Sequence, residues 1–234
     1  MNVRSPRLRS IYADISPSYE VVNHAMTMGL DMLWRRSAAD TAVQGGGTRW
    51  LDACTGTGEM AAILNHRSNQ SMTTIVASDF SMNMISQALA KKHNRRTRFV
   101  LAEVASSPFA DNCFDLVTTA FATRNLNPDR DSLLKCFREF HRILKPGGRY
   151  VSLETSQPRS RPLRLLFHLY VRLAVRPLGY MIARSRPGYD YLSKTIIRFH
   201  SAEDLAGILE EAGFSAVDYR RMMFGAVAVH RAVK

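Results

Sequence analysis

The sequence predicts a doubly wound α/β domain with a mostly parallel sheet, an N-terminal helical extension and one inserted helical segment. Short β-type runs alternate with helical stretches from Thr48 onward, which is the order of βαβ units. A glycine-rich turn follows the first of these runs and opens a helix. Of the 234 residues, 46% are hydrophobic and 22% are charged, so the composition is that of a globular protein with one sizeable core.

The elements follow one another in a regular order along the chain. Strands are expected at residues 49–53, 73–78, 98–101, 116–121, 150–153 and 224–230, because these runs are apolar and bounded by turn residues. Helices are expected at about residues 59–67, 81–93, 132–144 and 201–213. Lys145-Pro146-Gly147-Gly148 supplies the stop of the third helix. Gly45-Gly46-Gly47 separates the N-terminal segment from the remainder.

Charge is the feature that departs most from an average globular protein. The chain has 32 Lys and Arg against 20 Asp and Glu, a net charge of +12, and its pI is near 10.1. This balance indicates an anionic partner, either nucleic acid or an acidic membrane surface. The three cysteines lie far apart and the seven histidines show no metal-ligand spacing. We therefore expect a cytoplasmic, reducing location, no disulfide framework and no metal site.

The apolar runs and the N-terminus point the same way. The first ten residues carry three arginines but no apolar segment of the kind that a secretory signal needs. The most apolar region, residues 163–183, is interrupted by Arg164, Arg172, Arg176 and Pro177. We therefore expect no membrane-spanning segment, and a protein that is soluble or bound to a membrane face.

A carboxylate and a glycine turn end the first strand. Asp52 precedes Gly56-Thr57-Gly58, whose missing Cβ atoms allow a ligand to approach the backbone at a helix N-terminus. Asp79 lies twenty-one residues beyond Gly58, at the end of the second strand, where a carboxylate can accept both hydroxyls of a ribose. A dinucleotide site and a turn without a ligand remain the alternatives, although the position of Asp52 argues against NAD.

Four motifs in order carry a resemblance to a known class. They are Leu51 to Gly58, Ser78-Asp79-Phe80-Ser81, Pro108 to Asp115, and Arg142 to Arg149. Together they resemble the class I S-adenosylmethionine-dependent methyltransferases. The segment from Tyr12 to Arg36, Arg124-Asn125-Leu126 and the C-terminal Gly225 to His230 are similar, more narrowly, to the UbiE/Coq5 family of ubiquinone and menaquinone biosynthesis C-methyltransferases.

The resemblance implies a single Rossmann-like methyltransferase domain over residues 1–234, with a seven-stranded sheet and S-adenosyl-L-methionine as cofactor. Residues 1–44 would cap the substrate, 48–155 would form the cofactor-binding core, 156–200 a basic and apolar helical insertion, and 201–234 the C-terminal helix and strands. The residues that the resemblance assigns to the cofactor are Asp52, Gly56, Thr57, Gly58, Asp79, Phe80, Glu103, Val104 and Ala120. Glu103 departs from the usual Asn or Asp, and Ala120 from a commoner Ser.

The implied reaction is methyl transfer to a ring carbon of a prenylated quinol, demethylmenaquinol or a ubiquinone precursor. Arg124 would stabilise the phenolate or orient a water that takes the ring proton, since a guanidinium stays protonated. Tyr19 would close over the substrate. The structural alternatives are an ion pair of Arg124 with Asp129 or Asp131, and a packed aromatic side chain at Tyr19. His230 matches a family position, but a structural role is at least as well supported.

Residues 155–189 contain seven arginines and no acid. Arg164, His168, Arg172 and Arg176 recur every four residues, so on a helix they form one stripe beside a wide apolar face. This pattern is typical of a helix at an anionic membrane surface, here the inner face, and an ordinary solvated helix over the active site is the alternative.

Other functions are weighed against the same residues. A second basic cluster (Lys91, Lys92, Arg95, Arg96 and Arg98) keeps an RNA methyltransferase in view, but no RNA-binding module accompanies it, so we expect no nucleic acid partner. A methyltransferase of another small molecule or of a phospholipid, and a non-catalytic cofactor-binding module, also stay open. The sequence leaves a homodimer open.

Overall fold

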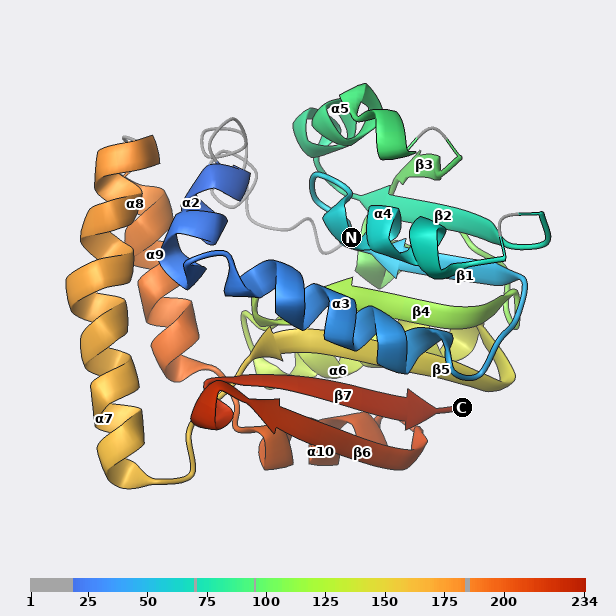
Figure 1. The fold of residues 1–234 in the computed structure, drawn as a ribbon. Coiled ribbons are helices and arrows are strands. Elements are labelled where there is room, and N and C mark those ends of the chain that lie inside the picture. The colour runs from blue at the N-terminus through green and yellow to red at the C-terminus, as the bar shows by residue number, and fades with distance from the viewer. Residues whose placement is uncertain (1–18, 70, 95, 184–185) are drawn as a thin grey trace.

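A seven-stranded sheet forms the centre of the computed structural model, which describes residues 19–69, 71–94, 96–183 and 186–234 (Figure 1). The strand order is β3-β2-β1-β4-β5-β7-β6. Strands β1 to β5 pair in parallel, and β7 is antiparallel to both of its neighbours. The strands are β1 (Arg49–Ala53), β2 (Thr74–Asp79), β3 (Arg98–Leu101), β4 (Phe114–Ala120), β5 (Leu144–Thr155), β6 (Ser215–Met222) and β7 (Val227–Val233). This confirms the predicted doubly wound, mostly parallel fold.

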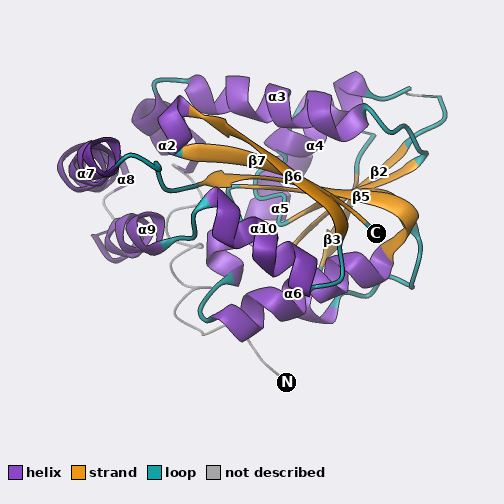
Figure 2. Cartoon of the chain, turned by 90° about the horizontal axis from the view of Figure 1, so that it is seen from below, coloured by secondary structure: helices purple, strands orange, loops and turns teal. Residues whose placement is uncertain are grey.

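Helices cover both faces of the sheet. The longer ones are α2 (Tyr19–Thr27), α3 (Leu30–Val43), α4 (Glu59–Arg67), α5 (Met82–Ala90), α6 (Arg130–Ile143), α7 (Arg161–Tyr170), α8 (Arg176–Ala183), α9 (Arg186–Arg198) and α10 (Ala202–Glu211). Short turns lie at η2 (Lys92–Asn94), η3 (Val104–Ser106), η4 (Thr123–Leu126), η5 (Val171–Val175) and η6 (Met223–Gly225). Helices α3 and α4 pack on one face of the sheet and α6 and α10 on the other (Figure 2).

A third apolar cluster lies beside the sheet rather than on it. Helices α2, α7, α8 and α9 form a separate group next to the ends of β4 and β5 (Figures 1 and 2). Val22, Val171, Tyr189 and Ile196 are its buried centre. The N-terminal extension and the inserted segment therefore pack on each other, although more than a hundred residues separate them.

Local signals account for most element boundaries. Helix α4 spans Glu59–Arg67 and β1 spans Arg49–Ala53, as the glycine turn between them predicts. Ser201 caps α10 in a capping box with Asp204. The last expected strand, residues 224–230, is wrong by three residues. Phe224 lies in a turn with φ of 56°, and β7 begins at Val227.

Strand β6 has no counterpart among the expected strands. Its residues show no fully buried position, so the apolar pattern that marks a strand in sequence is missing there. It pairs with β7 along the edge of the sheet. From the sequence alone, this polar segment resembles a loop. Its hydrogen bonds to β7 are what give it the conformation of a strand.

The inserted segment differs from its prediction in two respects. From Arg161 to Ile182 the helix is continuous through the π-helical turn η5, and its length and composition are sufficient to cross a membrane, contrary to the expectation of no such segment. Only 18% of the most apolar window is buried. Such a helix is weak evidence for a span, because helices of soluble proteins pass the same test.

The predicted arginine stripe is only partly exposed, because Arg172 is exposed and Arg164 is half-buried, and the apolar face beside it is exposed. Leu165, Leu166 and Leu173 are 69%, 62% and 68% exposed. His168, a member of the stripe, bonds instead to Gln157. The side chain of Arg176 lies outside the described residues.

Candidate functional site

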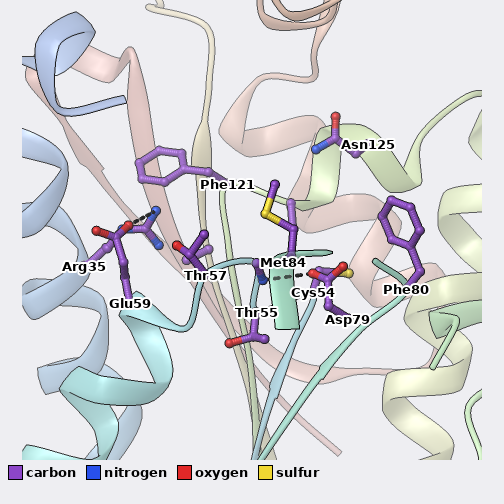
Figure 3. Close-up of a pocket in the computed structure, with 13 residues that line it drawn as sticks. Arg35, Cys54, Thr55, Thr57, Glu59, Asp79, Phe80, Met84, Phe121 and Asn125 are labelled. Carbon is purple, nitrogen blue, oxygen red and sulfur yellow. Dashed lines mark hydrogen bonds and ion pairs between the residues drawn. The ribbon is translucent and has the colours of Figure 1, made fainter. Parts of the chain in front are cut away.

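The glycine turn forms one wall of a cavity at the carboxyl edge of the sheet (Figure 3). Gly56 has φ of +57°, and a Cβ added there would meet nothing within 4 Å, so its backbone faces open space. Gly58 has φ of +81°, and an added Cβ would lie 2.4 Å from Asn94 Nδ2. Gly56 therefore leaves room for a ligand, whereas Gly58 is required by packing against η2.

Asp79 ties the second strand to this turn. Its Oδ2 accepts a hydrogen bond from the Gly56 N–H and its Oδ1 one from the Ser81 N–H, both at 2.9 Å. The carboxylate is directed toward the glycine turn in Figure 3. A carboxylate oxygen can accept more than one hydrogen bond, so these contacts are compatible with a pair of ligand hydroxyls.

We call this the glycine-turn cavity, and it brings together residues from the ends of three strands (β1, β2 and β4), from three helices (α3, α4 and α5) and from η4. Its described lining residues are Arg35, Cys54, Thr55, Gly56, Thr57, Glu59, Asp79, Phe80, Met84, Ala120, Phe121, Ala122 and Asn125. Of the residues expected from the sequence, Gly56, Thr57, Asp79, Phe80 and Ala120 are among them. Asp52, Gly58, Glu103 and Val104 are not.

Asp52 lies behind the cavity wall. Its carboxylate accepts hydrogen bonds from the hydroxyls of Thr55 (2.5 Å) and Thr118 (2.9 Å) and is buried. Burial raises its pKa to about 6, against the opposing effect of both hydroxyls. The structure therefore gives Asp52 a role in holding the glycine turn to β1 and β4.

Glu103 and Val104 lie farther along the same edge. Glu103 is the half-buried residue that precedes η3, and Val104 packs in the core on the α6 face. Their contact with the adenine stays a prediction from the resemblance. Figure 3 instead places Phe80, at the end of β2, beside Asp79.

A second, apolar cavity of about 390 Å³ adjoins the first and shares Phe121 with it. Its walls come from α2, α3, α7, η5, α9 and η6, and they are mostly aliphatic and aromatic. Met28 and Phe224 line it and are 81% and 80% exposed. These two side chains therefore mark where the apolar cavity opens to the surface.

Arg124 lies in the wall of the apolar cavity and pairs with Glu154. Its Nη1 is 2.8 Å from Glu154 Oε1, and its backbone N–H donates to Oε2 of the same carboxylate. Both side chains are buried. The alternative pairing with Asp129 or Asp131 is wrong, because Asp129 caps α6 through the Ser132 N–H.

Polar contacts beneath η4 fix the position of this arginine. Thr123 Oγ1 lies 3.0 Å from Ser152 Oγ, and Thr119 bonds to Tyr150 in the same buried cluster. These groups tie η4 to β4 and β5, so the Arg124 side chain has little freedom to move away from the apolar cavity.

Two other expected residues have different outcomes. Tyr19 begins α2, but its side chain lies outside the described residues, so its role stays a prediction. His230 is buried, and its Nε2 bonds to the Ala202 carbonyl at 2.9 Å. Burial lowers the pKa of His230, which fits a neutral structural histidine.

A cluster of charged groups between the two cavities was not predicted. His24 Nδ1 lies 2.9 Å from Asp31 and its Nε2 lies 3.3 Å from Glu59. Arg35 pairs with Glu59 at 3.2 Å (Figure 3). These residues come from three helices, so no local spacing in the sequence reveals them. The histidine and the two carboxylates are also close enough to share a cation, although the Arg35 guanidinium already supplies positive charge there.

Backbone strain gathers around the cavities. Positive φ occurs at the non-glycine residues Met28, Cys54, Phe121, Met223 and Phe224, which all line one cavity or both. Such conformations are unfavourable for residues with a Cβ and concentrate at functional sites. Phe121 stacks near Arg35, whose guanidinium lies 5.2 Å from the ring centroid.

Comparison with known proteins gives a match along the whole chain. The model of the ubiE/COQ5 methyltransferase family matches residues 1–234. The chain is 36% identical to the ubiquinone/menaquinone biosynthesis C-methyltransferase UbiE of Desulfotalea psychrophila over 231 residues, 99% of this chain and 92% of that protein. It is 35% identical to the demethylmenaquinone methyltransferase of Thermus thermophilus over 222 residues, 94% of this chain and 98% of that protein.

Solved structures share the fold at lower identity. A methyltransferase of Thermotoga maritima, described as a possible histamine N-methyltransferase, superposes with a TM-score of 0.68 at 18% identity, over 97% of this chain and 99% of that one. A phosphoethanolamine N-methyltransferase of Haemonchus contortus in complex with S-adenosyl-L-methionine gives a TM-score of 0.60 at 16% identity, over 85% of this chain and 52% of that one. These likenesses support the fold alone.

Proposed function

The chain belongs to the ubiE/COQ5 methyltransferase family, and we propose that it methylates a ring carbon of a prenylated quinol such as demethylmenaquinol or a ubiquinone precursor. The protein is an S-adenosylmethionine-dependent methyltransferase. The observation that carries the proposal for the substrate is the apolar cavity, which adjoins the glycine-turn cavity and contains a buried arginine in its wall.

The glycine-turn cavity fits the cofactor. S-adenosylmethionine supplies a methyl group on a sulfonium, already activated for transfer. Asp79 would accept the ribose hydroxyls, and the open backbone at Gly56 would allow the close approach of the methionine end. The residues present therefore match a ligand with a vicinal diol and a narrow polar tail.

The apolar cavity suits a lipid-like acceptor. Leu166, Phe167 and Val171 are among the aliphatic and aromatic side chains that would contact an isoprenoid chain. Polar side chains are few there, so the chain would be recognised through burial rather than hydrogen bonds. The ring would then lie toward Phe121, which both cavities share.

Arg124 is our candidate for the group that stabilises the acceptor's oxyanion. A ring carbon attacks well only when the neighbouring oxygen carries negative charge, and a fixed guanidinium lowers the energy of that charge. Glu154 holds Arg124 in place, so little reorganisation is needed. Tyr19 would close over the ring from the N-terminal side.

A comparison of lipid extracts tests the proposal. Cells with and without the gene are analysed by mass spectrometry, and purified protein is given labelled cofactor with demethylmenaquinol in detergent. We expect a quinone lighter by one methylene in the deletion strain and label on a ring carbon in vitro. The proposal is refuted when quinones are unchanged and the label is instead transferred to a phospholipid head group or another small molecule.

We further propose that the protein meets its substrate at an anionic membrane, at the inner face from the cytoplasm. Helix α7 and η5 present exposed Leu165, Leu166 and Leu173, of which Leu166 also lines the apolar cavity. Arg161 and Arg172 are exposed on the same helix. Leucines with flanking arginines suit an interfacial helix, and a second copy of the chain covering the same face is the competing arrangement.

A further inference from the structure

The proposed ring methylation creates a proton that the residues assigned so far cannot accept. After methyl transfer the ring carbon holds both a methyl group and a hydrogen, and this hydrogen must leave as a proton to restore the aromatic ring. Arg124 stays protonated and is paired with Glu154. Arg124 could therefore only orient a water that takes the proton, whereas a carboxylate in the wall of the apolar cavity could accept it directly.

Asp31 is the one carboxylate among the described residues that line the apolar cavity. The other titratable side chains of that lining are Arg124 and Tyr170. Burial raises the pKa of Tyr170, and its hydroxyl bonds to the Met26 carbonyl. Neither group is a base at neutral pH, whereas an aspartate can be.

The two oxygens of Asp31 differ in their surroundings. Oδ1 accepts hydrogen bonds from Thr27 Oγ1 and His24 Nδ1, each at 2.9 Å. Oδ2 is buried, and no described residue makes a hydrogen bond to it. It lies 2.9 Å from His24 Nδ1 and 3.9 Å from Arg35 Nε, close enough for attraction without a hydrogen bond. An unsatisfied carboxylate oxygen in a cavity wall is costly unless it serves a ligand or a reaction.

His24 connects this carboxylate to solvent. Its side chain is 38% exposed, and its two ring nitrogens reach Asp31 and Glu59. With His24 neutral, the carboxylates of Asp31 and Glu59 and the Arg35 guanidinium give the cluster a net charge of −1. Uptake of one proton therefore makes the cluster neutral. The cluster is therefore arranged to take up a proton and release it to water.

We infer that Asp31 accepts the proton from the methylated ring carbon and that His24 passes this proton to solvent. The C–H bond breaks, its electron pair returns to the ring, and the proton binds Asp31 Oδ2. Asp31 is then a catalytic residue and His24 a positioning residue that acts through it. The inference rests on the proposed function.

The test uses 2-prenyl-1,4-naphthoquinol with hydrogen or deuterium at its vacant ring carbon. Wild type, Asp31→Asn and Asp40→Asn are compared for turnover, for the isotope effect, and for affinity toward S-adenosylhomocysteine by calorimetry. Asp40 is the matched control, because it lies on the same helix, is exposed and pairs with Arg67. General base catalysis contributes at least about a hundredfold to a proton-transfer step, so in Asp31→Asn proton loss should slow by that much and limit turnover.

The isotope effect separates a base from a structural group. In wild type, proton loss follows methyl transfer quickly and deuterium should have little influence on the rate. In Asp31→Asn, proton loss becomes slow, so a primary isotope effect on turnover should emerge. The affinity for S-adenosylhomocysteine should stay within a few-fold of the wild-type value. Asp31→Ala should recover turnover when formate is added, which a merely structural role would not produce.

Several results would overturn the inference. Asp31→Asn with wild-type turnover would do so, as would a slow variant without an isotope effect and without formate rescue. Should the Asp31 variants not fold, His24→Gln keeps the carboxylate and must itself show the isotope effect for the inference to stand. Wild type that does not methylate the naphthoquinol at carbon refutes the proposed function instead, so the two failures are distinct.

Discussion

Asp79 combines two tasks at the end of β2, because it both orders the glycine turn and faces the cavity. The carboxylate accepts backbone N–H groups from the turn and from the start of α5. A ribose would add hydrogen bonds to the same oxygens. Removing this one side chain should therefore affect the cofactor far more than the sheet, whose strands do not depend on it.

Asp79→Ala should weaken binding of S-adenosylhomocysteine by at least about a hundredfold, since two hydrogen bonds to a charged group are worth about 1.5 kcal/mol each. Calorimetry measures the affinity, and Asp218→Ala on the edge strand β6 is the control, because Asp218 is exposed and far from the turn. Equal affinity in the two variants would remove Asp79 from the cofactor site.

Asp52 gives a prediction on pH. Burial raises its pKa from 3.8 to about 6. Between these values the folded protein holds a proton that the unfolded chain has lost, so this group makes stability fall as pH rises through the window. A shift of about two units corresponds to about 3 kcal/mol.

Asp52→Asn cannot ionise and should escape this loss. The free energy of unfolding of the variant minus that of wild type should increase by about 3 kcal/mol between about pH 4 and pH 7, measured by urea denaturation. Asp218→Asn serves for comparison. A difference that does not change with pH would show that Asp52 is not held in a buried, pKa-raising environment.

Site residues that could be predicted from the sequence lie at strand ends, whereas those that could not be predicted lie on helices that pack together. Asp79 and Gly56 could be predicted because each ends or follows a strand, and parallel strands place those ends at one edge. Asp31, His24 and Glu59 belong to three helices, so their meeting depends on helix packing that no local pattern encodes. Asp52 looked like a ligand group, but Thr118, sixty-six residues away, satisfies its carboxylate from β4.

At the scale of elements, η4 connects the sheet to the apolar cavity. Thr123 is fixed by Ser152 of β5, and the next residue is Arg124, whose charge is held by Glu154 of the same strand. Strand β5 therefore positions the arginine through two consecutive contacts. A buried ion pair of this kind is strongly destabilising when one partner is removed.

Glu154→Gln should test this dependence. It leaves the Arg124 charge buried without its carboxylate, so stability should fall by about 3 kcal/mol and turnover should fall with it. Arg124→Ala should reduce turnover far more than cofactor affinity. Glu211→Gln is the control, because it breaks only an exposed ion pair with Arg130. It should change neither stability nor turnover. Full turnover of Glu154→Gln would show that the oxyanion is stabilised elsewhere.

The inserted segment agrees with its prediction in its apolar face and differs from it in part of its basic stripe. A four-residue spacing of Arg164, His168 and Arg172 describes one stripe only on a regular α-helix. His168 lies before the π-helical turn at Val171–Val175 and bonds to Gln157, and the turn changes the number of residues per turn only beyond it. Arg172 is exposed, and so are Leu165, Leu166 and Leu173, the leucines of the apolar face that the sequence pattern places beside the stripe.

Taken as a whole molecule, the protein combines a net charge of +12 with an exposed apolar helix face. Charge draws the protein toward an anionic bilayer over a distance of about 10 Å at moderate salt. Burial of leucines acts only on contact and is insensitive to screening. The two contributions can thus be separated by salt.

The last prediction follows from that separation. Replacing Leu165, Leu166 and Leu173 by Ser should remove about 4.5 kcal/mol of vesicle binding, at about 1.5 kcal/mol for each buried leucine. Arg161→Gln with Arg172→Gln should remove about 2 kcal/mol, at about 1 kcal/mol per charge near the surface. Sedimentation with phosphatidylglycerol-containing vesicles at low and high salt measures both effects.

At high salt, the arginine variant should bind vesicles as well as wild type does. The leucine variant should still bind them more weakly than wild type. Leu89→Ser is the matched control, since this leucine is 60% exposed on α5, away from the inserted segment. A leucine variant that binds vesicles like wild type but changes from dimer to monomer in ultracentrifugation would show that a second copy, not a bilayer, covers α7. Binding that depends on the leucines would instead explain how an acceptor dissolved in the membrane reaches a cavity whose wall includes Leu166.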